Sequence, residues 1–205
     1  MLMLSTRGNA PQVSISTAIA AGLAPDGGLY MPATLPQFSP QDFADDTHLV
    51  QVAQRLLRPF FAGDVLAAQL DAICAAAFAV EPPLRRFGDH GDYILELFHG
   101  ATAAFKDYGA GFLAAALSAL PQGEKPLTIV VATSGDTGAA VGAAFHNKPN
   151  VRVAILYPDG RVAPRQAHQL GCFGDNVRAF RVDGSFDDCQ ALVKALLSDA
   201  TFKQE

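Results

Sequence analysis

Cysteine is scarce in this sequence, and its spacing excludes some kinds of site. The three cysteines, Cys74, Cys172 and Cys189, are far apart and form no C-x-x-C pair. Structural zinc sites and redox motifs commonly use such pairs, so we expect no metal site. The sequence instead predicts reduced thiols that pack as small apolar side chains in a cytoplasmic protein.

Long apolar runs and basic runs are also missing. No apolar stretch is long enough to cross a bilayer, and the first residues, MLMLSTR, lack the features of a signal peptide. The net charge is −5 without a basic run, which argues against nucleic acid or an anionic membrane as the main partner. Half of the 205 residues are hydrophobic, so a substantial core is expected, in one domain or in one domain and part of another.

Residues 1–90 show mainly helical patterns. The expected helices are residues 14–21, capped by Ser14 or Ser16 and stopped by Gly22, residues 47–60, and a third that Asp64 caps and that runs to residue 78 before two prolines. We therefore predict a helical N-terminal domain over residues 1–90, with no chemistry of its own.

From residue 91 to residue 205, apolar strands alternate with helices. The expected strands are residues 93–98, 127–133, 151–157 and 177–182, and the expected helices are residues 107–120, 137–147, 164–170 and 186–198. This alternation is typical of a parallel sheet covered on both faces. We predict an α/β fold in which the helical domain is followed by the first part of a three-layer α/β/α domain. The pattern continues to the last residues, so we expect the chain to stop inside that domain.

Lys106 stands where a predicted strand meets a predicted helix, in the segment ELFHGATAAFKD. Small residues there would let a flat ligand approach the backbone, and a helix start beside phenylalanines disfavours a charged amine. A lysine in that setting can form a Schiff base with an aldehyde cofactor. The alternative is a surface lysine paired with Asp107. Of the five histidines, only His99, beside this lysine, is a further candidate.

The segment VATSGDTGAA follows directly on another predicted strand. Its hydroxyls and N–H groups at a helix start suit a carboxylate or a phosphate, although no Walker A pattern is present. The alternative is a capping turn in which Asp136 or Thr137 only satisfies backbone donors. Arg161 follows the next strand and is either a phosphate ligand or a solvated turn residue.

Taken together and in order, these segments resemble the threonine synthase family, pyridoxal-phosphate enzymes of fold type II. The matching segments are STRG, GLAPDGGLY, ELFHGATAAFKD, VATSGDTGAA, ILYPDGRVAPRQ and FDDCQALVK. The resemblance implies that Lys106 carries pyridoxal 5′-phosphate as a Schiff base and that Asp136 touches the cofactor's edge. It implies substrate binding by the following residues: Ser134, Gly135, Thr137 and Gly138 for the α-carboxylate, and Arg161 for the phosphate.

The implied reaction converts O-phospho-L-homoserine and water to L-threonine and phosphate. Ala101, Ala103 and Ala163 replace a proline, a leucine and a serine of many members, which we expect to change loop rigidity and to remove one hydroxyl. Family members extend well past residue 205 and hold the cofactor's phosphate there, so we expect an inactive N-terminal fragment. The alternatives are a related pyridoxal-phosphate dehydratase or phospho-lyase, and a cofactor-free folding or interaction fragment. No oligomeric state is implied.

Overall fold

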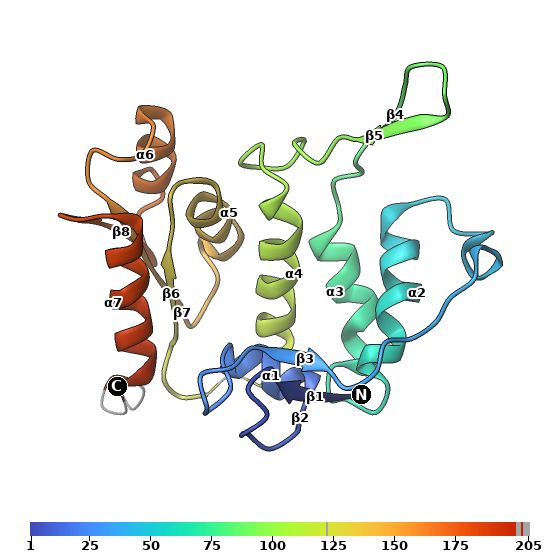
Figure 1. Ribbon diagram of the computed structural model, residues 1–205, viewed down its shortest axis with the longest axis horizontal. Helices are drawn as coiled ribbons and strands as arrows, with labels where there is room; N and C mark the ends of the chain where they lie inside the picture. Colours follow the sequence, from blue (N-terminus) through green and yellow to red (C-terminus); the bar gives the residue numbers. More distant parts are fainter. Residues whose placement is uncertain (122, 200–201, 203–205) are drawn as a thin grey trace. The chain divides into compact units, whose positions relative to one another are not determined.

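The computed structural model describes residues 1–121, 123–199 and 202 (Figure 1). The chain divides into two compact units. The first is Met1–Glu81 with Phe112–Pro121, and the second is Pro82–Gly111 with Gln122–Glu205. Helix α4 (Lys106–Ala119) contributes its beginning to the second unit and the remainder to the first.

The helices of the first unit lie where the apolar spacing predicts them. Helix α1 (Ile15–Ala21) is capped by Ser14 and ends at Gly22, where φ is 69°, and α2 spans Leu49–Phe61. A short 3₁₀ helix, η1 (Pro40–Phe43), precedes α2. These results confirm the first two predicted helices.

The third predicted helix begins later than expected. The carboxylate of Asp64 accepts a hydrogen bond from Leu66 N at 2.9 Å, but this bond closes a turn and not an α-helix. The 3₁₀ helix η2 (Ala67–Gln69) comes next, and α3 spans only Leu70–Ala77. Burial of Asp64 raises its pKa, but hydrogen bonds from Leu66 and Ser16 outweigh burial and leave the pKa below its ordinary value.

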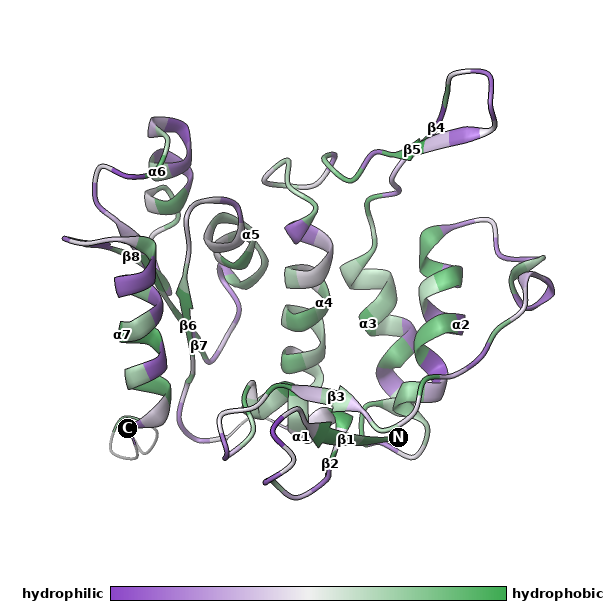
Figure 2. Cartoon of the chain, in the orientation of Figure 1, coloured by the Kyte–Doolittle hydropathy of each residue, from purple (hydrophilic) through white to green (hydrophobic). Residues whose placement is uncertain are grey.

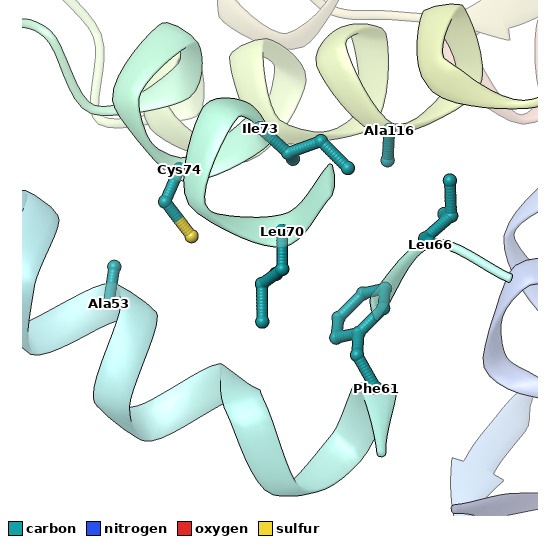
Figure 3. Close-up of a cluster of buried hydrophobic side chains, with 7 residues drawn as sticks. All are labelled: Ala53, Phe61, Leu66, Leu70, Ile73, Cys74 and Ala116. Carbon is teal, nitrogen blue, oxygen red and sulfur yellow. The ribbon is translucent and has the colours of Figure 1, made fainter. Parts of the chain in front are cut away.

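The core of the first unit forms where α2, α3 and the end of α4 meet (Figure 3). It contains Ala53, Phe61, Leu66, Leu70, Ile73, Cys74 and Ala116. Burial raises the pKa of the Cys74 thiol to about 11, so this cysteine behaves as a small apolar side chain. Cys189 is buried as well, whereas Cys172 is exposed, which contradicts the prediction for that one thiol.

The first unit also contains a small antiparallel sheet, which the sequence patterns do not predict. Its strands are β1 (Leu2–Ser5), β2 (Val13–Ser14) and β3 (Tyr30–Pro32), in the order β2-β1-β3. The carboxylate of Asp26 supports the sheet by accepting hydrogen bonds from Ser5 Oγ at 2.7 Å and from Gly28 N and Asn9 N at 2.9 Å. The bond from Ser5 is the main reason that the pKa of Asp26 is lowered. The segments STRG and GLAPDGGLY therefore support one local structure.

The second unit begins with a hairpin, which corrects the prediction for residues 93–98. Strand β5 (Asp92–Leu95) pairs antiparallel with β4 (Leu84–Phe87), and both strands are exposed. Gly88 and Gly91 supply positive φ angles of 67° and 82° in the turn between them, a conformation that glycine adopts readily. The strand expected to open the parallel sheet is therefore half of a hairpin.

The parallel sheet contains three strands among the described residues, in the order β6-β7-β8. They are β6 (Leu127–Ala132), β7 (Val151–Pro158) and β8 (Val177–Val182), and the helices that follow them are α5 (Asp136–Phe145), α6 (Pro164–Gly171) and α7 (Phe186–Ser198). Helix α5 packs against β7 and α6, and α7 packs against β6 and β7. The predicted parallel alternation from residue 127 onward is confirmed. None of the described helices is both long and apolar enough to cross a membrane.

Candidate active site

Two of the predicted motifs lie at one edge of the parallel sheet. Strands β6 and β7 pair in parallel, with Ala132 opposite Leu156, so the residues that follow them leave the sheet at the same, carboxyl edge. The turn at residues 134–138 follows β6, and Arg161 follows β7. Ligands of open α/β sheets bind at this edge.

Thr133 organises the turn that follows β6. Its side chain is almost completely buried, with 2% exposed. Thr133 Oγ1 accepts hydrogen bonds from Gly135 N at 3.0 Å and Gly138 N at 2.9 Å, and it donates to Gly135 O at 3.1 Å. The N–H groups of these two glycines are therefore already paired and are not the free donors that carboxylate binding would require.

Other donors in the same turn remain available. Asp136 and Thr137 are the first residues of α5, where backbone N–H groups have no partner within the helix. Ser134, Asp136 and Thr137 are exposed. Within the described part of the chain, neither these two N–H groups nor the hydroxyls of Ser134 and Thr137 have a hydrogen-bond partner. This helix start can therefore accept an anion.

Gln166 of α6 contacts the same turn, and it is not among the site residues predicted from the sequence. Its Nε2 donates a hydrogen bond to Asp136 Oδ1 at 2.9 Å. Its side-chain amide also lies against Gly135, where φ is 149° and a Cβ atom would come within 2.5 Å of Gln166 Cδ. Thr133 was likewise overlooked. Gln166 lies in ILYPDGRVAPRQ and Thr133 in VATSGDTGAA, two of the segments that resemble the threonine synthase family. The sequence signal for Thr133 is a hydroxyl residue directly after an apolar strand.

Lys106 is the first residue of α4 and is half-buried. Figure 2 shows that α4 is hydrophilic at this end and mostly hydrophobic beyond its first turn. Lys106 Nζ lies 4.5 Å from the centroid of the Phe105 ring, a cation–π contact. Among the described residues, no carboxylate pairs with this amine.

The carboxylate of Asp107 faces the preceding loop instead of Lys106. It accepts hydrogen bonds from Thr102 N at 2.8 Å and Thr102 Oγ1 at 2.6 Å. A Cβ atom at Gly100 would collide with the Asp107 side chain, so glycine is needed there. The ion pair between Lys106 and Asp107, which the surface-lysine alternative requires, is not formed.

His99 belongs to a separate group of side chains. Its Nε2 lies 2.9 Å from Glu96 Oε2, and Glu96 Oε1 lies 3.8 Å from Arg85 Nε in the hairpin. The imidazole also stacks on Phe98, with 4.7 Å between ring centroids. No hydrogen bond joins His99 to Lys106 in the described part of the chain.

Arg161 is exposed in the turn after β7 and close to the start of α7. The pKa of Asp188 there is lowered first by hydrogen bonds from Ser185 N and Oγ, both at 2.7 Å, and further by the positive charge of Arg161. No carboxylate forms an ion pair with Arg161 among the residues described. Its guanidinium is therefore available to a phosphate.

The structure joins the turn at residues 134–138 to Gln166 and places Arg161 at the same sheet edge. No hydrogen bond or ion pair links Lys106 to this group within residues 1–121, 123–199 and 202. A parallel α/β sheet whose carboxyl edge presents a helix start with free donors defines the class: an α/β protein with a candidate anion-binding site at that edge.

Comparison with known proteins identifies the family. A family model described as pyridoxal-phosphate dependent enzyme matches residues 84–203, and one described as threonine synthase N terminus matches residues 3–78. The chain belongs to the pyridoxal-phosphate-dependent enzyme family. The resemblance predicted from the ordered motifs and the predicted fold class are confirmed.

The relatives that the chain resembles are threonine synthases. It is 42% identical to the Haemophilus influenzae enzyme over 193 residues, covering 94% of this chain and 45% of that one. It is 40% identical to the Escherichia coli enzyme over 206 residues, covering 99% and 47%.

Solved structures show the same similarity. The crystal structure of threonine synthase from Escherichia coli matches with a TM-score of 0.89 at 39% identity, over 99% of this chain and 47% of that one. The structure of the threonine synthase from Brucella melitensis, described as bound to PLP, matches with a TM-score of 0.83 at 42% identity, over 98% and 45%. The chain spans about half the length of the curated relatives it matches.

Proposed function

We propose that this chain is the lysine-bearing part of a threonine synthase. The complete enzyme would convert O-phospho-L-homoserine and water to L-threonine and phosphate. The observation that carries the proposal is the setting of Lys106 in a family-matching segment. Its amine lies over Phe105 and has no carboxylate partner among the described residues, since Asp107 is bound to Thr102. The absence of a paired carboxylate leaves this amine available for covalent attachment of an aldehyde.

Pyridoxal 5′-phosphate would be attached at Lys106, and Asp136 would lie at the cofactor's edge, as the family match supports. When bound, this cofactor supplies an electron sink for negative charge at the substrate's carbon atoms. Lys106 would take a proton from Cα and later return protons as a general acid. The contact with Phe105 and the position at the start of α4 would limit where the amine can move during these transfers.

The two ends of the substrate would bind to different parts of the same sheet edge. Its α-carboxylate would accept hydrogen bonds from the hydroxyls of Ser134 and Thr137 and from the free N–H groups at the start of α5. Gly135 and Gly138 would contribute the close backbone packing of the turn, because their N–H groups are bound to Thr133. Arg161 would bind the phosphate, which leaves from Cγ while water adds at Cβ.

A cytoplasmic location is part of this proposal. The three cysteines form no disulfide, which suits a reducing compartment. O-Phospho-L-homoserine is a small, highly charged metabolite, and the proposal includes no nucleic acid or membrane partner.

A chimaeric enzyme tests the proposal. Residues 1–205 replace the matching half of the Escherichia coli enzyme, to which they are 40% identical. The chimaera is incubated with pyridoxal phosphate and reduced with borohydride, and the modified lysine is mapped by mass spectrometry. We expect the adduct on Lys106, and Lys106→Ala to remove both the adduct and activity, the latter by roughly 10²–10⁴-fold. The matched control is Lys194→Ala, which changes an exposed lysine of α7.

Product analysis separates this function from its relatives. A threonine synthase releases one phosphate for each threonine formed, whereas a phospho-lyase releases phosphate with ammonia and a 2-oxo acid. An adduct on a lysine other than Lys106, or phosphate release without threonine, would contradict the proposal. The same labelling on the 205-residue chain alone tests the cofactor-free alternative.

A further inference from the structure

Gln166 is the residue of this sheet edge that connects two helices. It lies in the first turn of α6 and donates its Nε2–H to Asp136 Oδ1 at 2.9 Å, at the first residue of α5. The two residues are 30 positions apart in the chain. Their hydrogen bond therefore fixes the start of one helix against the start of the next.

The backbone of Gly135 has a shape that accommodates this connection. With φ at 149°, Gly135 is in a region that other residues rarely adopt, and the space where a Cβ atom would stand is occupied by the Gln166 amide. The same amide thus touches the cap residue of α5 and binds its first residue. Gln166 is packed against the turn as well as bonded to it.

The connection joins the two anion-binding regions of the proposed function. The free donors of Ser134 and Thr137 flank Asp136 on the α5 side. On the α6 side, Pro164 begins the helix three residues after Arg161. A substrate with a carboxylate at one end and a phosphate at the other would need these two regions held at a constant spacing.

We propose that Gln166 is a positioning residue that fixes the turn at residues 134–138 relative to α6 and the Arg161 turn. The inference rests on the proposed function for its substrate. The contact requires a hydrogen-bond donor at position 166, because the Asp136 oxygen accepts the bond. Glutamate at position 166 would place two acceptors face to face.

The experiment compares four versions of the 205-residue chain with the parent. Gln166→Met keeps the length of the side chain and removes the donor, and Gln166→Glu replaces the donor with a charge. In the double variant Asp136→Asn/Gln166→Glu, donor and acceptor exchange sides. Gln169→Met is the matched control, since it changes a glutamine of the same helix whose side chain has no hydrogen bond among the described residues.

The first readout, followed by NMR, is the backbone amide of Gly138, which is buried and bonded to Thr133 Oγ1 at 2.9 Å. We expect faster hydrogen exchange at this amide in Gln166→Met and an increase of about fivefold in the dissociation constant for inorganic phosphate, as for loss of one net hydrogen bond. Gln166→Glu should weaken phosphate binding further, because it adds a negative charge beside the turn. The double variant should recover affinity relative to Gln166→Glu, and Gln169→Met should match the parent.

The second readout is the kinetics of the chimaera. Gln166→Met should raise KM for O-phospho-L-homoserine by about fivefold and change kcat by less than about twofold, because the lost contact positions the ground state and the transition state alike. A fall in kcat with unchanged KM would overturn the positioning role. So would unchanged phosphate affinity in Gln166→Met, an equal loss in Gln169→Met, or no recovery in the double variant.

The phosphate titration does not depend on threonine synthesis, so either proposal can be refuted without refuting the other. A chimaera that makes no threonine would refute the proposed function. Unchanged phosphate affinity in Gln166→Met would refute only the inference about Gln166.

Discussion

Replacing Thr133 by valine should destabilise the second unit without changing the shape of its core. Valine has the outline of threonine but carries a methyl group in place of Oγ1. That oxygen accepts hydrogen bonds from Gly135 N and Gly138 N, and both glycines are buried. Thr133→Val would therefore leave two buried N–H groups without partners.

The expected cost follows from these two orphaned donors. A buried donor that loses its partner costs about 1–3 kcal/mol, so two together cost about 2–5 kcal/mol after a small gain from the more apolar side chain. Thr133→Ser is the matched control because it keeps the hydroxyl and loses one methyl group, which costs about 1 kcal/mol. The predicted order of stability is threonine, then serine, then valine.

Urea unfolding measures the difference. The chain contains no tryptophan, so far-UV circular dichroism is the signal, and the midpoint and slope are fitted for each variant. Faster hydrogen exchange at the Gly138 amide in Thr133→Val would show that the loss of stability arises in the turn at residues 134–138. If valine is tolerated as well as serine, or costs less than about 1 kcal/mol, the three hydrogen bonds of Thr133 do not organise this turn.

Other predictions concern packing, thiols and pH. Gly138→Ala should lower the free energy of unfolding by about 1–3 kcal/mol, because a Cβ there would overlap three buried side chains. Gly109→Ala in α4 should raise it by about 1 kcal/mol, because the added Cβ meets nothing within 4 Å; urea titrations of the two variants should show opposite signs. Iodoacetamide should modify Cys172 in the folded chain and spare Cys74, whose pKa burial raises to about 11; mass spectrometry showing both modified at similar rates would contradict the core placement. Burial raises the pKa of Asp64, but hydrogen bonds from Leu66 and Ser16 outweigh burial and leave the folded pKa below its ordinary value. The ionised Asp64 therefore stabilises the fold fully above the unfolded pKa of about 3.9, and this stabilisation is lost as pH falls through the folded pKa. Asp64→Asn should therefore flatten the loss of stability in acid, measured by circular dichroism.

Local periodicity predicted most elements of the second unit because their signals are local. Helix α7 and strand β8 have the predicted bounds, Phe186–Ser198 and Val177–Val182. The start of α7 is fixed by a capping box in which Ser185 and Asp188 bond reciprocally. Such signals lie within four residues and are visible in one sequence.

The missed elements depend on pairing between distant residues. Strand β1 has four residues and β2 has two, too few for a recognisable alternation, and Met3 pairs with Pro32 from far along the chain. The prediction that residues 93–98 belong to the parallel sheet is wrong for a related reason. An apolar strand has the same pattern whether its partner is parallel or antiparallel, and the turn at Gly88 and Gly91 received no weight.

The candidate site shows the same limit at the level of single atoms. Residue types at the start of α5 were enough to predict an anion-accepting turn. They did not reveal that Gly135 N and Gly138 N are bound to Thr133, because that depends on how the hydroxyl of a buried side chain is directed. Nor did they reveal Gln166, whose partner Asp136 is 30 residues away.

The segment around Lys106 shows how the structure changes the meaning of a pattern. Its small residues first indicated space for a flat ligand, but Gly100 is required because the Asp107 side chain fills the position of its Cβ. Asp107 is there because it binds Thr102 through two hydrogen bonds. The carboxylate of Asp107, which is adjacent to Lys106 in sequence, is therefore bonded to the loop. It does not form an ion pair with the Lys106 amine. Asp107 could act by holding the loop or by directing the amine of Lys106, and Asp107→Asn in the chimaera separates these two roles. If Asp107 only holds the loop, the variant should change hydrogen exchange at the Thr102 amide and leave the borohydride label on Lys106. Labelling transferred to another lysine would show that Asp107 directs the amine itself.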